Sequence, residues 1–244
     1  KDGMNMFPQI FKYCKYEYLQ ETLNNLTLKS SRLDSFNDPL ESVYQIKIHS
    51  NKLNGKELIA MHNKKKNYID DKLKEICVIC FSEVNNEPLM WSHYANEHKG
   101  ICLEFDVETI FDREDVSCAS IVYSSAIPLL DVFVNNTQNI HLDKLLHSVI
   151  NTKSIHWSYE KEIRMYKKHH TKDVFYFNEK SLKSVILGLR FDDKERTIVQ
   201  ELVATYNKKH KTNVKIEHAL QATNSYQLMI RAHNASPQPY LFST

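Results

Sequence analysis

The sequence predicts a mixed α+β fold, in which a single domain spans residues 1–244 and a largely antiparallel sheet, intact or split, is flanked by helices. The chain has 244 residues, of which 42% are hydrophobic and 25% are charged, so it can bury a sizeable core. Short strand-like runs are more frequent than amphipathic helical segments. No repeat, low-complexity segment or Pro/Gly-rich linker marks a domain boundary.

Strands are predicted where short apolar or aromatic runs end at turn-forming residues. The segments that fit are 11–16, 27–31, 75–83, 100–106, 120–123, 174–177, 184–190, 214–216 and 226–231. Helices are predicted at 19–26, 89–94 and 192–210. The polar, lysine-rich residues 42–76 are expected to form helices that cover the sheet, and residues 127–155 a helical excursion.

Composition limits the possible functions. The net charge of +2 predicts no general affinity for polyanions such as nucleic acid. The chain has only 4 glycines, and they form neither the G-x-G-x-x-G nor the G-x-x-x-x-G-K-[ST] spacing. P-loop nucleotide hydrolysis and a Rossmann dehydrogenase are therefore disfavoured, although nucleotides can be held in other ways.

Neither a membrane segment nor a metal site is predicted. The sequence has no run of about 20 apolar residues and no signal-peptide core, so we expect a cytoplasmic protein without membrane contact. The 5 cysteines are odd in number and suit reduced core thiols. Cys77 and Cys80 have C-x-x-C spacing without a second pair, and His93 and His98 lack a third ligand nearby.

An acid-rich segment at residues 156–166 is the main candidate for chemistry. If it is a strand, Glu160, Glu162 and Arg164 project from one face, so two carboxylates share that face with a guanidinium. If it is a helix, Glu160 and Arg164 form an ordinary surface pair. We favour the strand, because its aromatic and β-branched residues suit a sheet. The face can be either a solvated surface or a site.

A second candidate is the segment Asn37-Asp38-Pro39-Leu40-Glu41. Proline forces a turn here and biases the preceding residue to an extended conformation. The same residues can instead begin a helix, with Asp38 as the cap. In either case Asn37, Asp38 and Glu41 place an amide and two acids close together, and we count all three as candidates for cofactor binding.

Four sequence boxes occur in a fixed order: Asn37-Asp38-Pro39-Leu40-Glu41; Phe81-Ser82 leading to Met90-Trp91-Ser92-His93-Tyr94; Lys99-Gly100-Ile101-Cys102-Leu103-Glu104-Phe105; and Trp157-x-x-Glu160-x-Glu162-x-Arg164. In this order they resemble a widespread bacterial family of unknown function, whose members carry N-D-P-F-E, M-W-x-x-Y and W-x-x-E-x-E-x-R. Leu40 departs from that pattern, in which phenylalanine is more frequent. Membership of this family alone implies no reaction.

A weaker resemblance is to ADP-ribosyltransferases, which clamp NAD in a split sheet without a glycine-rich loop. It implies that NAD is a substrate and that the protein is a bacterial toxin or defence effector with a protein or nucleic-acid acceptor. Glu162 matches the second acid of the E-x-E motif, which holds the ribose 2'-hydroxyl and stabilises the oxocarbenium-like transition state. Glu160 would orient the acceptor. Arg164 would keep its neighbours ionised or bind a phosphate.

The same resemblance assigns the remaining candidates to cofactor binding. Tyr13 or Lys15 would occupy the first-strand position that anchors NAD, where many transferases have His or Arg. Ser82 would support Glu162. Trp91 or Tyr94 could stack on nicotinamide, although a helical face with these aromatic residues equally suits an ordinary core.

Two other classes of function compete with the transferase. A metal-dependent nuclease could bind Mg²⁺ through Asp38, Glu41, Glu160 and Glu162. In the other class the boxes are structural, Glu41 and Arg164 form a buried bridge, and the protein is a binding or sensing module of a defence system.

Overall fold

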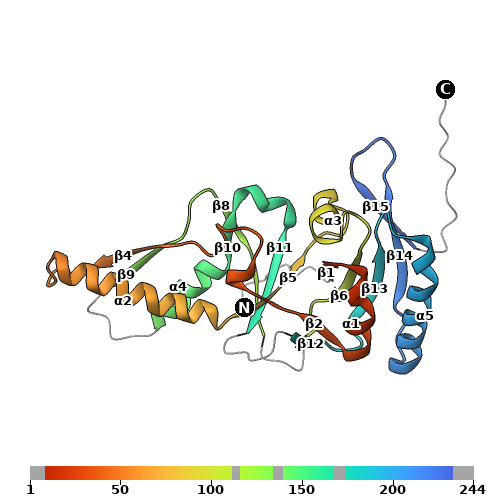
Figure 1. Ribbon diagram of the computed structural model, residues 1–244, viewed down its shortest axis with the longest axis horizontal. Helices are drawn as coiled ribbons and strands as arrows, with labels where there is room; N and C mark the ends of the chain where they lie inside the picture. Colours follow the sequence, from red (N-terminus) through yellow and green to blue (C-terminus); the bar gives the residue numbers. More distant parts are fainter. Residues whose placement is uncertain (1–8, 112–115, 134–139, 168–173, 233–244) are drawn as a thin grey trace. The chain divides into compact units, whose positions relative to one another are not determined.

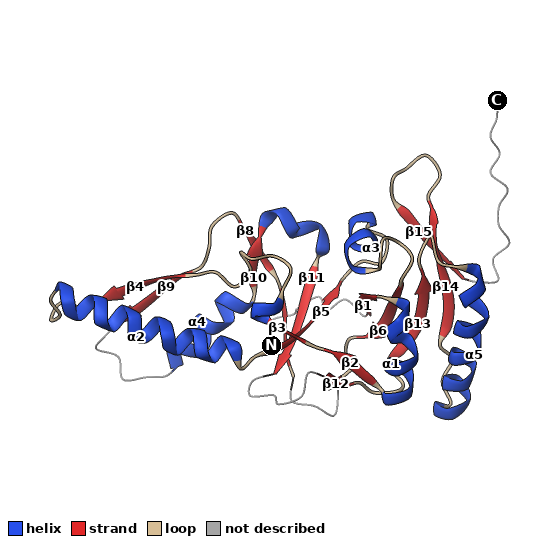
Figure 2. Ribbon diagram, viewed as in Figure 1, coloured by secondary structure: helices blue, strands red, loops and turns tan. Residues whose placement is uncertain are grey.

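The computed structural model describes residues 9–111, 116–133, 140–167 and 174–232. Helices and mostly antiparallel strands are both well represented, which confirms the predicted α+β class (Figure 2). Contacts divide the chain into two compact units. Unit 1 comprises Lys1–Thr27, Ser82–Arg113 and Phe177–Thr244, and unit 2 comprises Leu28–Phe81 and Glu114–Tyr176. Among the described helices, none combines the length and the apolar character that crossing a membrane would require.

Unit 1 is built on a sheet with the strand order β15-β14-β13-β6-β1. The strands are β1 (Gln9–Cys14), β6 (Ile101–Asp106), β13 (Leu182–Leu187), β14 (Lys215–Gln221) and β15 (Leu228–Ala232). Neighbouring strands are antiparallel except β13 and β14, which are parallel and connected by α5 (Asp193–His210). The unit also contains the short helix η1 (Tyr16–Tyr18), α1 (Leu19–Asn25) and α3 (Pro88–Tyr94) (Figure 1).

The helix predicted at 192–210 is confirmed as α5, and local signals set both of its ends. The Asp192 carboxylate accepts a hydrogen bond from the Lys194 amide, which caps the N-terminus. Lys211 adopts a left-handed conformation and ends the helix. Val199, Val203 and Tyr206 are buried at helical spacing, so α5 presents one apolar stripe to the core.

Unit 2 contains β5 (Cys77–Ser82), whose last residue belongs to unit 1, and β5 pairs with both β3 (Ser31–Arg32) and β11 (Glu162–Lys167). On its other side β11 pairs with β7 (Ser117–Ser120). Three further pairs are β4 (Gln45–His49) with β9 (Leu129–Phe133), β8 (Val122–Ser124) with β10 (Thr152–Ser154), and β2 (Thr27–Lys29) with β12 (Val174–Tyr176). The helices are η2 (Leu33–Ser35), α2 (Gly55–Lys74), α4 (Ile140–Ile150) and η3 (Ile155–Glu160).

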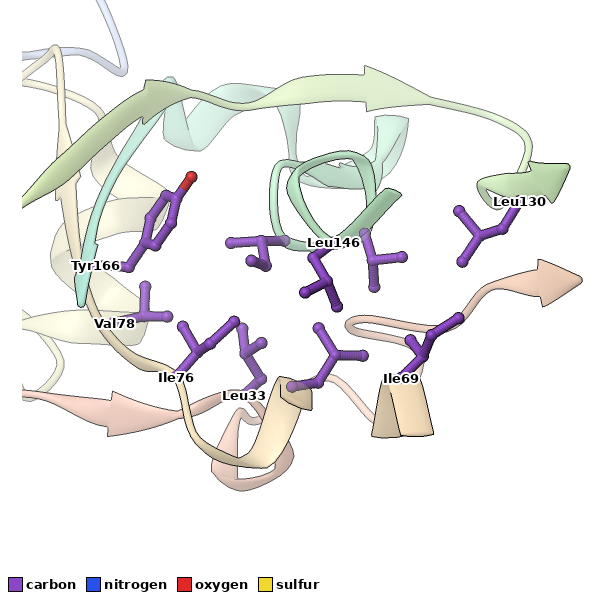
Figure 3. Packing of buried hydrophobic residues seen from close by; sticks show 10 residues of the cluster. Leu33, Ile69, Ile76, Val78, Leu130, Leu146 and Tyr166 are labelled. Atoms are coloured by element: carbon purple, nitrogen blue, oxygen red, sulfur yellow. The ribbon is translucent and has the colours of Figure 1, made fainter. Parts of the chain in front are cut away.

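The apolar core of unit 2 joins elements that are far apart in sequence. Leu146 of α4 lies among side chains from η2, β5, α2 and β9, including Leu33, Val78, Ile69 and Leu130 (Figure 3). All five are at most 5% exposed. Burial of each such aliphatic side chain contributes roughly 1.5 to 3 kcal/mol before the cost of lost chain entropy.

Two predicted helical regions were partly wrong. Residues 42–76 contain α2, but Gln45–His49 form a strand, because β4 pairs with β9 and Asn54 caps the helix only at Gly55. In the predicted helical excursion at 127–155, α4 is helical, whereas Leu129–Phe133 form β9 and Thr152–Ser154 form β10. Each of these short strands depends on a partner that local sequence does not reveal.

The acid-rich segment is only half a strand, which corrects the prediction for residues 156–166. Ile155–Glu160 form the 3-10 helix η3, Lys161 is left-handed with a φ of 43°, and the strand begins at Glu162. Of the two alternatives at Asp38, the turn forms and the helix start does not. The turn prediction is correct there, because Asp38 accepts hydrogen bonds from the Leu40 and Glu41 amides.

Candidate functional site

Five charged side chains of unit 2 meet in its interior, and we call them the ion cluster: Glu41, Lys153, Glu160, Glu162 and Arg164. They come from the turn after Pro39 and from β10, η3 and β11. The side chains of Glu41, Glu160, Glu162 and Arg164 are at most 3% exposed, and that of Lys153 is 8% exposed. The cluster therefore lies within the packed interior.

Lys153 forms ion pairs with all three carboxylates of the cluster. Its Nζ lies 2.5 Å from Glu160 Oε2, 3.1 Å from Glu162 Oε2 and 3.7 Å from Glu41 Oε2. The left-handed turn at Lys161 makes this possible, because it lets Glu160, at the end of η3, and Glu162, at the start of β11, face the same ammonium. Lys153 was not predicted from the sequence, because it is an isolated lysine that belongs to no motif.

Arg164 holds the other side of the cluster. Its Nε donates to Glu162 Oε1 at 2.7 Å, and its Nη2 donates to Glu41 Oε1 at 2.6 Å. Its Nη1 donates to the Ile150 carbonyl, and its guanidinium carbon lies 5.2 Å from the centre of the Phe36 ring. The Glu41–Arg164 bridge proposed from the sequence is therefore present, across 123 residues of chain.

Charge pairing outweighs burial in this cluster. Burial alone would raise the pKa of Glu162, but the charges of Arg164 and Lys153 lower it to about 2. Burial would lower the pKa values of Lys153 and Arg164, but the neighbouring glutamates raise both. Glu162 is also hydrogen-bonded to Cys80 of β5, and its amide donates to the Tyr123 hydroxyl. Lys153 is thus a paired cation at neutral pH, not a free nucleophile.

The Asn-Asp-Pro turn contacts η3. Trp157 Nε1 donates to Asp38 Oδ2 at 2.7 Å, and Lys153 Nζ lies 5.1 Å from the centre of the Trp157 ring. Asn37 is exposed. Two of the sequence boxes are thereby joined, because Asp38 contacts Trp157 while Glu41 contacts Arg164.

The other predicted cofactor-binding residues belong to unit 1, and two of them pack in its core. The rings of Tyr13 and Trp91 meet edge to face at 5.2 Å. The Tyr13 hydroxyl donates to the Val84 carbonyl, and Trp91 Nε1 donates to the Asn85 carbonyl. Tyr13 is 6% exposed and Trp91 fully buried, so both rings are covered by protein in this structure.

Ser82, Lys15 and Tyr94 complete the predicted set in unit 1. Ser82 is 1% exposed, and its hydroxyl accepts a hydrogen bond from the Val84 amide. Lys15 is exposed at the start of η1, and Tyr94 is half-buried at the end of α3. Their assignment to NAD stays a prediction.

Within the described ranges, no group of three or more His, Cys, Asp or Glu side chains is arranged to hold a metal ion. The acids proposed for a magnesium site face Lys153, Arg164 or Trp157 instead. Neither Cys77 nor Cys80 forms a disulfide with a described residue.

Comparison with curated proteins and with solved structures finds no significant match. A comparison with protein families does find one, and the matched residues include Lys153, Glu160, Glu162 and Arg164 but not Glu41. Residues 90–165 match the family described as "Protein of unknown function (DUF2971)", which confirms for this stretch the resemblance to a family of unknown function.

Proposed function

We propose that the protein is a non-catalytic binding module, in which the ion cluster supports the fold of unit 2. The observation that carries this proposal is the environment of Glu162. Its Oε1 accepts from Arg164, its Oε2 faces Lys153 and Arg164, and the residue is only 3% exposed.

A carboxylate that stabilises an oxocarbenium-like ribose must face the substrate where positive charge develops. Glu162 faces two protein cations instead, and these already neutralise the negative charge that it would offer a substrate. A buried ion pair of this kind is costly to break, because the remaining partner becomes an unpaired charge in the interior. This arrangement supports a structural role for the acid-rich segment.

The second candidate is the NAD-dependent ADP-ribosyltransferase-like enzyme, or NAD glycohydrolase, acting as a toxin or defence effector. One observation favours it: Glu41 and Ser42 line a cavity of about 240 Å³ within unit 2. The Ser42 hydroxyl has no hydrogen-bond partner among the described residues. A ligand in this cavity would contact the ion cluster from the side of Glu41.

Two measurements on the purified full chain separate the candidates: nicotinamide release from NAD, with and without EDTA, and urea unfolding. Glu162→Gln is the test variant, and Glu201→Gln, at an exposed position on α5, is the matched control. We expect no nicotinamide release from any form and a loss of stability in Glu162→Gln alone. Release by the native chain that is lost in a fully stable Glu162→Gln variant would overturn the proposal in favour of the transferase.

A further inference from the structure

Unit 1 contains a cavity of about 700 Å³ along its sheet, which we call the lysine groove. Its lining includes Glu104, Lys183, Lys215 and Glu217 from β6, β13 and β14, with Lys180 and Lys211 from adjoining loops. The volume falls within the range of roughly 300 to 1,000 Å³ that is usual for small-molecule sites. No residue of the ion cluster lines this groove.

Strand register places the polar residues of the groove on one face of the sheet. Glu104 lies opposite Ser184, and Ser184 lies opposite Lys215. Residues opposite one another on neighbouring strands share a face, as do residues two apart on one strand, which adds Glu217. One continuous polar surface therefore runs across three strands, through Glu104 of β6, Ser184 of β13, and Lys215 and Glu217 of β14.

We infer that the lysine groove binds a phosphorylated, hydroxyl-rich small molecule, of the class of a sugar phosphate. This inference names the ligand class of the proposed binding module and rests on that proposal. The charge balance supports it: four lysines and two glutamates line the groove, and Asp106, which lies 3.4 Å from Lys183 Nζ, offsets one lysine, so four positive and three negative charges leave an excess positive charge. A phosphate monoester carries about −1.5 to −2 at neutral pH, so its binding would remove this excess.

The second half of the ligand follows from the oxygen acceptors in the groove. Ser184, which is 1% exposed, donates its hydroxyl hydrogen to Glu104 Oε2 at 2.5 Å and fixes that carboxylate. The other oxygen, Oε1, accepts no hydrogen bond from any described residue. Carboxylate oxygens accept hydrogen bonds from hydroxyl groups. Glu104 and Glu217 therefore suit the hydroxyls of a sugar, while the lysines suit its phosphate.

The lining also distinguishes this ligand from a nucleic-acid strand. No aromatic ring is among the described residues that line the groove. Sites for single strands usually stack bases on aromatic side chains, each stack contributing roughly 1 to 3 kcal/mol. A small phosphate ester needs no such platform.

The test is calorimetric titration and thermal unfolding of the full chain with ribose 5-phosphate, glucose 6-phosphate and fructose 1,6-bisphosphate. Ribose, glucose, inorganic phosphate and a twelve-nucleotide thymidine strand serve as comparison ligands. We expect at least one sugar phosphate to raise the melting temperature. It should bind at least tenfold more tightly than the unphosphorylated sugar, inorganic phosphate or the thymidine strand. No response to any sugar phosphate, equal affinity for inorganic phosphate, or tighter binding of the strand would each overturn the inference.

Variants then assign any binding to the groove. Lys211→Glu with Lys215→Glu should weaken it at least tenfold, and the milder pair Lys211→Gln with Lys215→Gln should weaken it in the same direction. The control pair Lys208→Glu with Lys209→Glu makes the same charge change at exposed positions of α5 outside the groove. Equal weakening by the test and control pairs would overturn the assignment. Nicotinamide release is measured on the same samples, so failure of the proposed module and failure of its ligand class give different results.

Discussion

The ion cluster of unit 2 and the lysine groove of unit 1 use similar side chains under opposite conditions. In the cluster, Arg164 is fully buried and bonded to two glutamates. In the groove, Lys211 and Lys215 are exposed beside a cavity. Buried charges must be paired within the protein, whereas solvent-exposed charges are available to bind a ligand. Charge composition alone therefore does not identify a binding site, and burial and pairing do so better.

The largest effect expected from this contrast is the loss of Arg164. Arg164→Met removes the partner of Glu41 and Glu162 and leaves both carboxylates without their guanidinium. We expect unfolding free energy to fall by about 3 to 5 kcal/mol, measured by urea denaturation. Arg190→Met, at an exposed position, should cost less than about 1 kcal/mol. Equal costs for the two variants would contradict the structural role of the cluster.

Lys153 should show the next largest effect and a specific dependence on Glu160. Lys153→Met should cost about 3 kcal/mol, because it leaves a buried excess of negative charge. In that background Glu160→Gln should cost less than it does in the native chain, because the carboxylate has already lost its ammonium. A double-mutant cycle by urea denaturation measures this difference. Strictly additive costs would show that the two side chains do not interact.

Acid should weaken the cluster. The pKa of Glu162 is about 2 in the folded chain against an ordinary value of 4.5, so its contribution is present above about pH 4.5 and is lost as the pH falls toward 2. The shift corresponds to a contribution on the order of 3 kcal/mol. Urea denaturation between pH 7 and pH 3 should show this decline, and Glu162→Gln should reduce it. If Glu201→Gln reduces it equally, the decline does not come from Glu162.

The smallest effect is expected in the groove, and it has the opposite sign. Burial and then Glu217 raise the pKa of Glu104, although Ser184, Lys215 and Lys183 oppose them. A carboxyl group whose pKa is higher in the folded chain than in the unfolded chain stabilises the fold at a pH below its unfolded-state pKa. This contribution to the free energy of unfolding is lost as the pH rises through the folded-state pKa. The free energy of unfolding of Glu104→Gln should therefore increase by up to about 1 kcal/mol relative to that of the native chain as the pH rises from 4 to 7. A relative loss on raising the pH would contradict this account.

Much of the fold could be predicted from local sequence, because strand and helix periods are local properties. The predicted strands at 100–106 and 184–190 and the helix at 192–210 appear as β6, β13 and α5 with small shifts at their ends. The strand β9 was not predicted, because it depends on pairing with β4 more than 80 residues away.

The candidate site was predictable only in part. The boxes indicated that Glu41, Glu160, Glu162 and Arg164 belong together, and the structure joins all four through Lys153 and Arg164. They did not indicate Lys153, nor that Glu160 precedes the strand in a 3-10 helix. A left-handed lysine at position 161 has no clear local signature, since glycine is the usual residue for that conformation.

The sequence by itself determined the α+β class, the turn at Asp38 and the order of most elements, since apolar period and proline geometry act over a few residues. Only the tertiary structure decided which charged side chains are buried and paired and which line a cavity. The partners in question, such as Glu41 with Arg164 and Glu104 with Ser184, lie 123 and 80 residues apart. Their pairing depends on how the chain packs, because burial makes an unpaired charge costly only after distant segments have excluded water.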